Sequence, residues 1–135
     1  MGSPAHERID DYLVRCDVEY DALGDGMWVI HDDLEQVDNV VISCNPPLVV
    51  FRVKVMEIPS DPETQRELYQ KLLTLNATDL VSGAYGLEGS SVIMTETLQA
   101  ENLDFNEFQV AIEGTIMALR EHYDVLKAFH HPSDA

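Results

Sequence analysis

The chain has 135 residues, of which 45% are hydrophobic and 24% are charged. This balance is typical of one soluble globular domain and excludes a disordered chain. We expect a single domain over residues 1–135, with an ordered core at about residues 5–128. Its 25 acidic residues against 8 basic ones give a formal charge of −17. Such a charge repels nucleic acid and anionic membrane surfaces, so we expect neither as a partner.

The N-terminus and the cysteines indicate a cytoplasmic protein. The stretch "MGSPAHERID" at residues 1–10 lacks the apolar core of a signal peptide, and no apolar run is long enough to span a bilayer. Two cysteines, Cys16 and Cys44, are too few for a disulfide scaffold, and we interpret both as small buried hydrophobic residues.

The first half of the chain is predicted to form one helix and then four strands. Apolar residues at helical spacing between Ile9 and Cys16 predict a short helix that starts at Ser3 and Pro4. From residue 17, apolar and acidic residues alternate as in a strand, and "GDG" at 24–26 turns the chain into the return strand "MWVIHD". The acidic segment at 32–39 is predicted to be a solvated connection, followed by the strand "VVISCN".

The fourth strand, "LVVFRVKVMEI", is the longest and follows a stop at Asn45-Pro46-Pro47, because prolines do not fit a central ladder. Its alternation predicts one core face and one mixed face. The core face is predicted to carry Val49, Phe51, Val53 and Val55. The mixed face is predicted to carry Val50, Arg52, Lys54 and Met56.

The second half is predicted to form a helix, two strands and a final helix. Ser60 and Glu63 around Pro62 match a capping box, and Asp104 with Glu107 match another. The first of these helices buries Leu68, Leu72 and Leu75. The last helix carries a long apolar stripe: Phe105, Phe108, Ile112, Ile116, Leu119, Tyr123 and Leu126. The order is therefore α-β-β-β-β-α-β-β-α, which predicts the α+β class, an antiparallel sheet with helices packed against it.

Gly83, Gly86 and Gly89 could form either a phosphate-binding loop or the turns of a hairpin. Their spacing is G-x-x-G-x-x-G, whereas a dinucleotide fingerprint needs G-x-G-x-x-G before a helix. A strand follows here, and no Lys or Arg lies between Lys71 and Arg120. We therefore predict an antiparallel hairpin of residues 83–88 with 91–98 that turns at Gly89.

No motif supports a catalytic residue, a cofactor or a metal. Asp21, Asp25, Gly26 and Asp32 match four positions of a calcium loop, but Leu23 takes a ligand position and strands flank the segment. The histidines and cysteines lack the paired spacing of a zinc site. We predict that the protein is not an enzyme. The alternative of a small enzyme with an unrecognised active site, such as a Cys–His pair, stays open.

Two residues of the second predicted helix widen its apolar stripe beyond what one core needs. These residues are Tyr69 and Leu73, and together with Tyr85 and Leu87 of the glycine-rich strand they form our candidate dimer or client interface. A monomer seldom exposes such residues contiguously, so we expect a homodimer.

The run "LLTLNATDLVSGAYGLEGSSVIMTETL" at 72–98, followed by "LDFNEF" and a long helix, resembles the YbjN-type sensory regulators and the Tir-chaperone (CesT-like) group of type III secretion chaperones. The places of that pattern are filled by Leu75-Asn76, Gly83, Gly86-Leu87, Val92 and Leu98. The resemblance spans about residues 5–128 in element order, with its motif at 72–110. It implies a type III secretion chaperone-like α/β sandwich, a homodimer without catalytic residues that holds an extended segment of a client protein. Addition of a client strand to a sheet edge is physically reasonable, although no residue marks a client groove.

Overall fold

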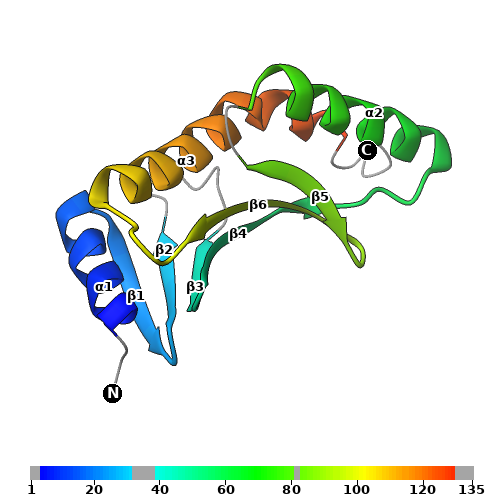
Figure 1. Ribbon diagram of the computed structural model, residues 1–135. Coiled ribbons are helices and arrows are strands. Elements are labelled where there is room, and N and C mark those ends of the chain that lie inside the picture. The colour runs from blue at the N-terminus through cyan, green and yellow to red at the C-terminus, as the bar shows by residue number, and fades with distance from the viewer. Residues whose placement is uncertain (1–3, 32–38, 81–82, 130–135) are drawn as a thin grey trace.

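The computed structural model describes residues 4–31, 39–80 and 83–129 of the chain. Within these residues, three helices and six strands follow one another in the predicted order α-β-β-β-β-α-β-β-α (Figure 1). The elements are α1 (Pro4–Cys16), β1 (Glu19–Gly24), β2 (Met27–His31), β3 (Val40–Asn45), β4 (Leu48–Glu57), α2 (Pro62–Thr78), β5 (Ala84–Glu88), β6 (Ser91–Gln99) and α3 (Phe105–Lys127). The predicted α+β class is confirmed, while residues 32–38 of the predicted acidic connection and the tail at 130–135 lie outside the described residues.

The six strands form one antiparallel sheet in the order β1-β2-β3-β4-β6-β5. Neighbours in space are neighbours in sequence except for β4 and β6, which pair across the segment that holds α2 and β5. In the β5–β6 hairpin, Glu88 lies opposite Ser91, and Gly89 takes a φ of +59° in the turn. The predicted hairpin is confirmed, and the helix that a phosphate loop requires after these glycines is absent from residues 83–99.

Tight turns join the strands of the first half as predicted. Asn45 lies opposite Leu48, so the two prolines occupy the turn between β3 and β4. Gly24 lies opposite Met27 across the "GDG" turn. In that turn Gly26 has a φ of +77°, and a Cβ atom there would lie 2.6 Å from the carbonyl oxygen of Cys44. Only glycine therefore fits both the backbone angle and the close approach of β3.

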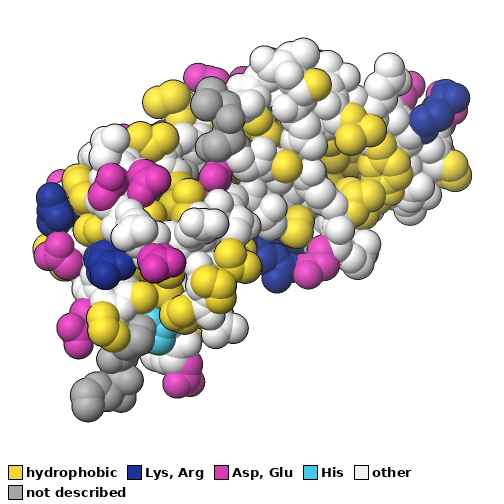
Figure 2. All heavy atoms as spheres, viewed as in Figure 1, with side chains coloured by type: hydrophobic (Ala, Val, Ile, Leu, Met, Phe, Trp, Pro, Cys, Tyr) yellow, Lys and Arg dark blue, Asp and Glu magenta, His cyan; other side chains and the backbone are white. Residues whose placement is uncertain are grey.

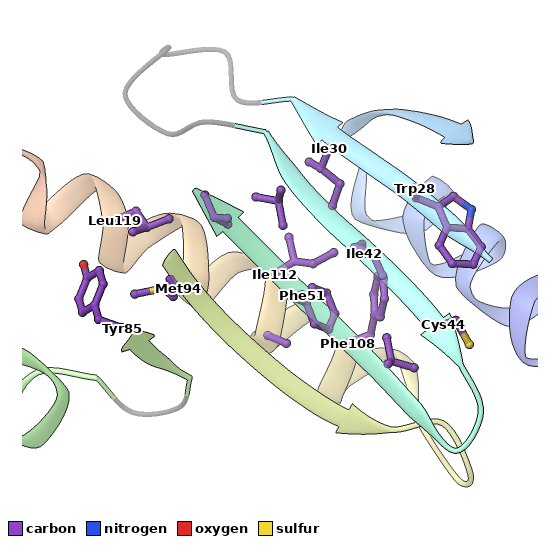
Figure 3. Close-up of a cluster of buried hydrophobic side chains, with 14 of the residues drawn as sticks. Trp28, Ile30, Ile42, Cys44, Phe51, Tyr85, Met94, Phe108, Ile112 and Leu119 are labelled. Carbon is purple, nitrogen blue, oxygen red and sulfur yellow. The ribbon is translucent and has the colours of Figure 1, made fainter. Parts of the chain in front are cut away.

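The core lies between one face of the sheet and the three helices. Figure 3 shows Phe51 of β4 beside Phe108 of α3, and their ring centroids are 5.5 Å apart. We call this side the helix-covered face and the opposite side the helix-free face. The strands bury on the helix-covered face Trp28, Ile30, Val40, Ile42, Cys44, Val49, Phe51, Val53, Val92 and Met94. The predicted core face of β4 is thus confirmed from Val49 to Val53.

A β-bulge changes the two faces near the end of β4. The register with β6 shifts between Lys54 and Met56, and an extra residue at that point reverses the alternation of side chains. Met56 is therefore buried and Val55 is only half-buried. The assignment of Met56 to the mixed face was wrong for this reason, whereas the half-buried Val55 still packs against the core.

Side-chain caps start the second and third helices. At α3, Glu107 N–H donates to Asp104 at 2.8 Å and Asp104 N–H donates back to the Glu107 carboxylate at 3.1 Å, which confirms the predicted capping box. At α2, the cap is Asp61 rather than Ser60, because Pro62 occupies the first turn and the Asp61 carboxylate accepts from Thr64 N–H at 2.9 Å. The pKa of Asp61 is lowered by this backbone hydrogen bond.

Polar side-chain contacts link helix α1 to the sheet and to the loop that precedes α3. Asp10 accepts a 2.7 Å hydrogen bond from the Trp28 indole, and the Tyr12 hydroxyl donates to the Leu103 carbonyl at 2.9 Å. The expectation of two buried cysteines is confirmed for Cys44, whereas Cys16 is half-buried. Desolvation raises the pKa of both thiols, so neither is an activated nucleophile.

Candidate functional site

The candidate interface residues lie on two adjoining elements, α2 and β5. Leu73 of α2 is 68% exposed, Leu87 of β5 is 51% exposed, and Tyr69 is half-buried. Hydrophobic side chains gather where α2 lies over the β5 end of the sheet (Figure 2). We call Tyr69, Leu73 and Leu87 the α2–β5 surface.

The local structure explains why these residues remain exposed. Leu68, Leu72 and Leu75 of α2 are buried, so Leu73, one position after Leu72, is rotated by about 100° toward solvent. In β5, Leu87 lies opposite the buried Val92 and therefore belongs to the helix-covered face. Leu87 is nevertheless exposed, which shows that the helices do not cover this end of that face.

Tyr85 does not belong to this surface, in contrast to the expectation from the sequence. Its side chain is only 6% exposed, and its hydroxyl lies 2.7 Å from Nδ1 of His122 in α3. The other ring nitrogen of His122 lies 3.3 Å from the carboxylate of Asp79, the C-cap residue of α2. Tyr85 is therefore a core residue that links β5 to α2 and α3, and it does not form part of the exposed surface.

The chain of hydrogen bonds from Asp79 through His122 to Tyr85 is structural. Burial, and secondly the nearby Asp79 charge, raise the pKa of the Tyr85 phenol, so this hydroxyl keeps its proton. His122 is 4% exposed, with both ring nitrogens in hydrogen-bonding contact. Sequence reasoning missed His122, although it lies three residues after Leu119 and four before Leu126, on the buried stripe of α3.

Within residues 4–31, 39–80 and 83–129, no cluster of three or more His, Cys, Asp or Glu side chains could hold a metal ion. Asp21, from the calcium-loop match, instead accepts a hydrogen bond from His31 at 2.9 Å. Hydrogen bonds to Asp21 and then to Asn39 raise the pKa of His31, because both partners offer acceptor atoms to the ring. No helix in the described part of the chain has the length and apolarity needed to cross a membrane.

The helix-free face carries a second, flatter candidate surface. A broad hollow of about 720 Å³ lies over the strands on this side. Val41, Val50 and Ile93 are among the apolar residues that line it, and each is half-buried. Two ion pairs also lie here, Arg52 with Glu88 and Lys54 with Glu57, so the basic groups on this face already have acidic partners.

Comparison with known protein families shows to which family the chain belongs. The sequence matches the family CesT_Tir_1 over residues 3–132. The chain belongs to this family. The CesT_Tir_1 match confirms the resemblance to the CesT-like group, and because the family consists of chaperones without catalytic activity, it also confirms that the chain is not an enzyme. A search of curated proteins found no match.

Solved structures show the same fold. A chain of the heterodimeric ExoU–SpcU complex from the type III secretion system of Pseudomonas aeruginosa has a TM-score of 0.67 at 16% identity, covering 93% of this chain and 99% of that one. YbjN, a putative transcription regulator from E. coli, has a TM-score of 0.65 at 12% identity, covering 86% and 89%. The HopA1–SchA chaperone–effector complex gives 0.64 at 15% identity, covering 87% and 91%. The predicted type III secretion chaperone-like fold is confirmed by these likenesses.

Proposed function

We propose that this chain is a chaperone-like binding protein of the cytoplasm that acts as a homodimer and holds an extended segment of a client protein. The observation that carries the proposal is the CesT_Tir_1 match over residues 3–132. A chaperone–effector complex among the structures of the same fold supports the same role.

The α2–β5 surface is our candidate for the dimer interface. Leu73 and Leu87 are more than half exposed, and burying a large apolar side chain contributes about 1.5–3 kcal/mol. Single exposed leucines are ordinary on monomers, whereas apolar residues on adjoining elements are typical of interfaces. A second copy packed on this surface would remove both side chains from water.

Leu73→Asp tests the dimer, because it would bury a charge in a desolvated contact. We expect light scattering to give a dimer mass for the natural protein and a monomer mass for this variant. Val14→Asp is the matched control, since Val14 of α1 is 65% exposed and lies outside the α2–β5 surface. A concentration-independent monomer mass of the natural protein, or equal dissociation by Val14→Asp, would contradict the proposed interface.

The acidic charge is proposed to assist the approach of a client and to keep the protein soluble. A charge of −17 attracts a basic segment at long range, and apolar contacts with backbone pairing then supply most of the affinity. At 0.5 M salt the Debye length is roughly 4 Å, which removes the steering and leaves packed contacts intact.

The test uses a client captured from native cells and identified by mass spectrometry, followed by kinetics on the purified complex. Raising salt to about 0.5 M should mainly slow association, because salt screens the long-range attraction between the acidic protein and a basic client segment. Leu73→Asp should abolish dimerisation or client binding under the same conditions. If salt alone dissociates the complex while Leu73→Asp has little effect, the binding is electrostatic and the proposed mechanism is wrong.

A further inference from the structure

Glu96 of β6 places a carboxylate on the helix-covered face of the sheet, where the residue is only 8% exposed. It lies opposite Phe51 of β4, and the residues two positions away along β6, Met94 and Leu98, are apolar. Within residues 4–31, 39–80 and 83–129, no hydrogen bond or ion pair reaches the Glu96 side chain. The described part of the chain therefore buries this carboxylate among apolar neighbours and supplies no donor for it.

A buried carboxylate without a partner lowers the stability of the free protein. The ionised group loses its hydration on burial, and buried polar side chains are therefore nearly always hydrogen-bonded. His122, another buried polar residue of this core, follows that rule, because both of its ring nitrogens lie in hydrogen-bonding contact. Glu96 breaks the rule. A residue that breaks it and gains no contact within the fold is typical of a site that is kept for a ligand.

Gly83, the residue before β5, leaves a way from solvent to this carboxylate. Ala84 pairs with Thr95, so the chain at Gly83 lies beside Glu96. A Cβ atom on Gly83 would lie 3.0 Å from Oε1 of Glu96 and 2.9 Å from the carbonyl oxygen of Thr95. Gly83 is itself exposed and has a φ of +78°, which favours glycine. Two acceptor oxygens therefore converge beside an exposed residue that has no side chain to cover them.

We propose that Glu96 binds an arginine side chain of a client protein at the opening beside Gly83. This inference rests on the proposed function only for the source of the arginine. A guanidinium is planar and weakly hydrated, and it donates two parallel hydrogen bonds to a carboxylate with further N–H groups free for a nearby carbonyl such as that of Thr95. A lysine ammonium is more strongly hydrated, so it loses more on entering a buried site. The formal charge of −17 attracts cationic segments toward the protein.

Thermal unfolding of the free protein tests whether Glu96 lacks a role in the fold. Glu96→Met replaces the carboxylate by an unbranched apolar side chain of similar size. We expect this variant to melt about 3 °C or more above the natural protein, because an unpaired buried charge is removed. Glu101→Met is the matched control, since Glu101 is exposed, and should leave the melting temperature unchanged. A melting temperature of Glu96→Met at or below that of the natural protein would show that the carboxylate supports the fold and would overturn the proposal.

Amide chemical shifts test the ligand with three defined probes. N-acetyl-arginine amide should shift the resonances of Gly83 and Glu96 until they saturate, the lysine amide should do so more weakly, and the uncharged citrulline amide should have no effect. Glu96→Gln keeps the size of the side chain and should lose the response at Gly83, although the acidic surface is otherwise unchanged.

An equal response to citrulline amide, or a response that persists at Gly83 in Glu96→Gln, would overturn the proposal, and equal binding of the lysine amide would overturn the choice of arginine. Neither measurement uses a captured client or depends on the oligomeric state. A monomer mass in light scattering would refute the proposed dimer and leave both results unaltered, so the two failures can be told apart.

Discussion

Replacing Tyr85 with Phe should destabilise the protein through a single oxygen atom. The Tyr85 hydroxyl lies 2.7 Å from Nδ1 of His122, and both side chains are buried. Phe retains the ring and its packing but leaves this nitrogen without its partner in the core. A buried polar atom without a partner costs about 1–3 kcal/mol of unfolding free energy. For a chain of this length, each kcal/mol lowers the melting temperature by about 3–5 °C.

Urea denaturation followed by circular dichroism measures this loss. Tyr20→Phe is the matched control, because Tyr20 is half-buried and its hydroxyl has no hydrogen bond within the described residues, so its change should stay within about 0.5 kcal/mol. His122→Leu combined with Tyr85→Phe should cost less than the sum of the two single changes, since both polar partners are then absent. If Tyr85→Phe is no more destabilising than Tyr20→Phe, the hydroxyl does not support the core and the reasoning fails.

Three further outcomes follow from caps, charge and packing. Asp104→Ala should lower the unfolding free energy by about 1 kcal/mol in urea titrations, since it removes the acceptor of the Glu107 N–H; an unchanged midpoint would contradict this. In an NMR titration the pKa of His31 should lie above its usual 6.5 and should fall in Asp21→Asn. Because folding raises this pKa, the contribution of His31 to stability is present at low pH and is lost as the pH rises through the folded-state pKa. Phe51→Ala, at a site 1% exposed, should cost about 3–5 kcal/mol in the same urea assay, and a loss below about 1 kcal/mol would show that the site collapses around the change.

Local sequence signals predicted caps and turns correctly where only one residue at the position could serve that role. The capping box of α3 was predictable because Asp104 and Glu107 have the required spacing and a long apolar stripe follows. At α2, both Ser60 and Asp61 are good cap residues, and the structure shows that Asp61, directly before Pro62, is the N-cap. The element order and the hairpin at Gly89 were predictable because their turn residues are unambiguous.

Features that depend on contacts distant in sequence could not be predicted. The bulge in β4 lies between Lys54 and Met56, and adjacent apolar residues there gave no sign of where an extra residue enters the ladder. The burial of Tyr85 depends on His122, which lies in another element, α3. The sequence did not predict His122 in the core, because its side chain is polar. Among the candidate interface residues, Leu73 and Leu87 are exposed, and no signal in the sequence separates them from the buried Tyr85.

The pairing of β4 with β6 has a consequence for how the chain folds. Every other strand pair joins neighbours in sequence, so the β1–β4 meander and the β5–β6 hairpin can each form from local contacts. The β4–β6 ladder instead closes a loop that contains all residues between Glu57 and Ser91, including α2, and the entropy of that closure must be lost before the ladder gains stability. We expect the transition state for folding to be the joining of these two preformed units, with mutations in β4 and β6 slowing folding and mutations in β1 mainly speeding unfolding.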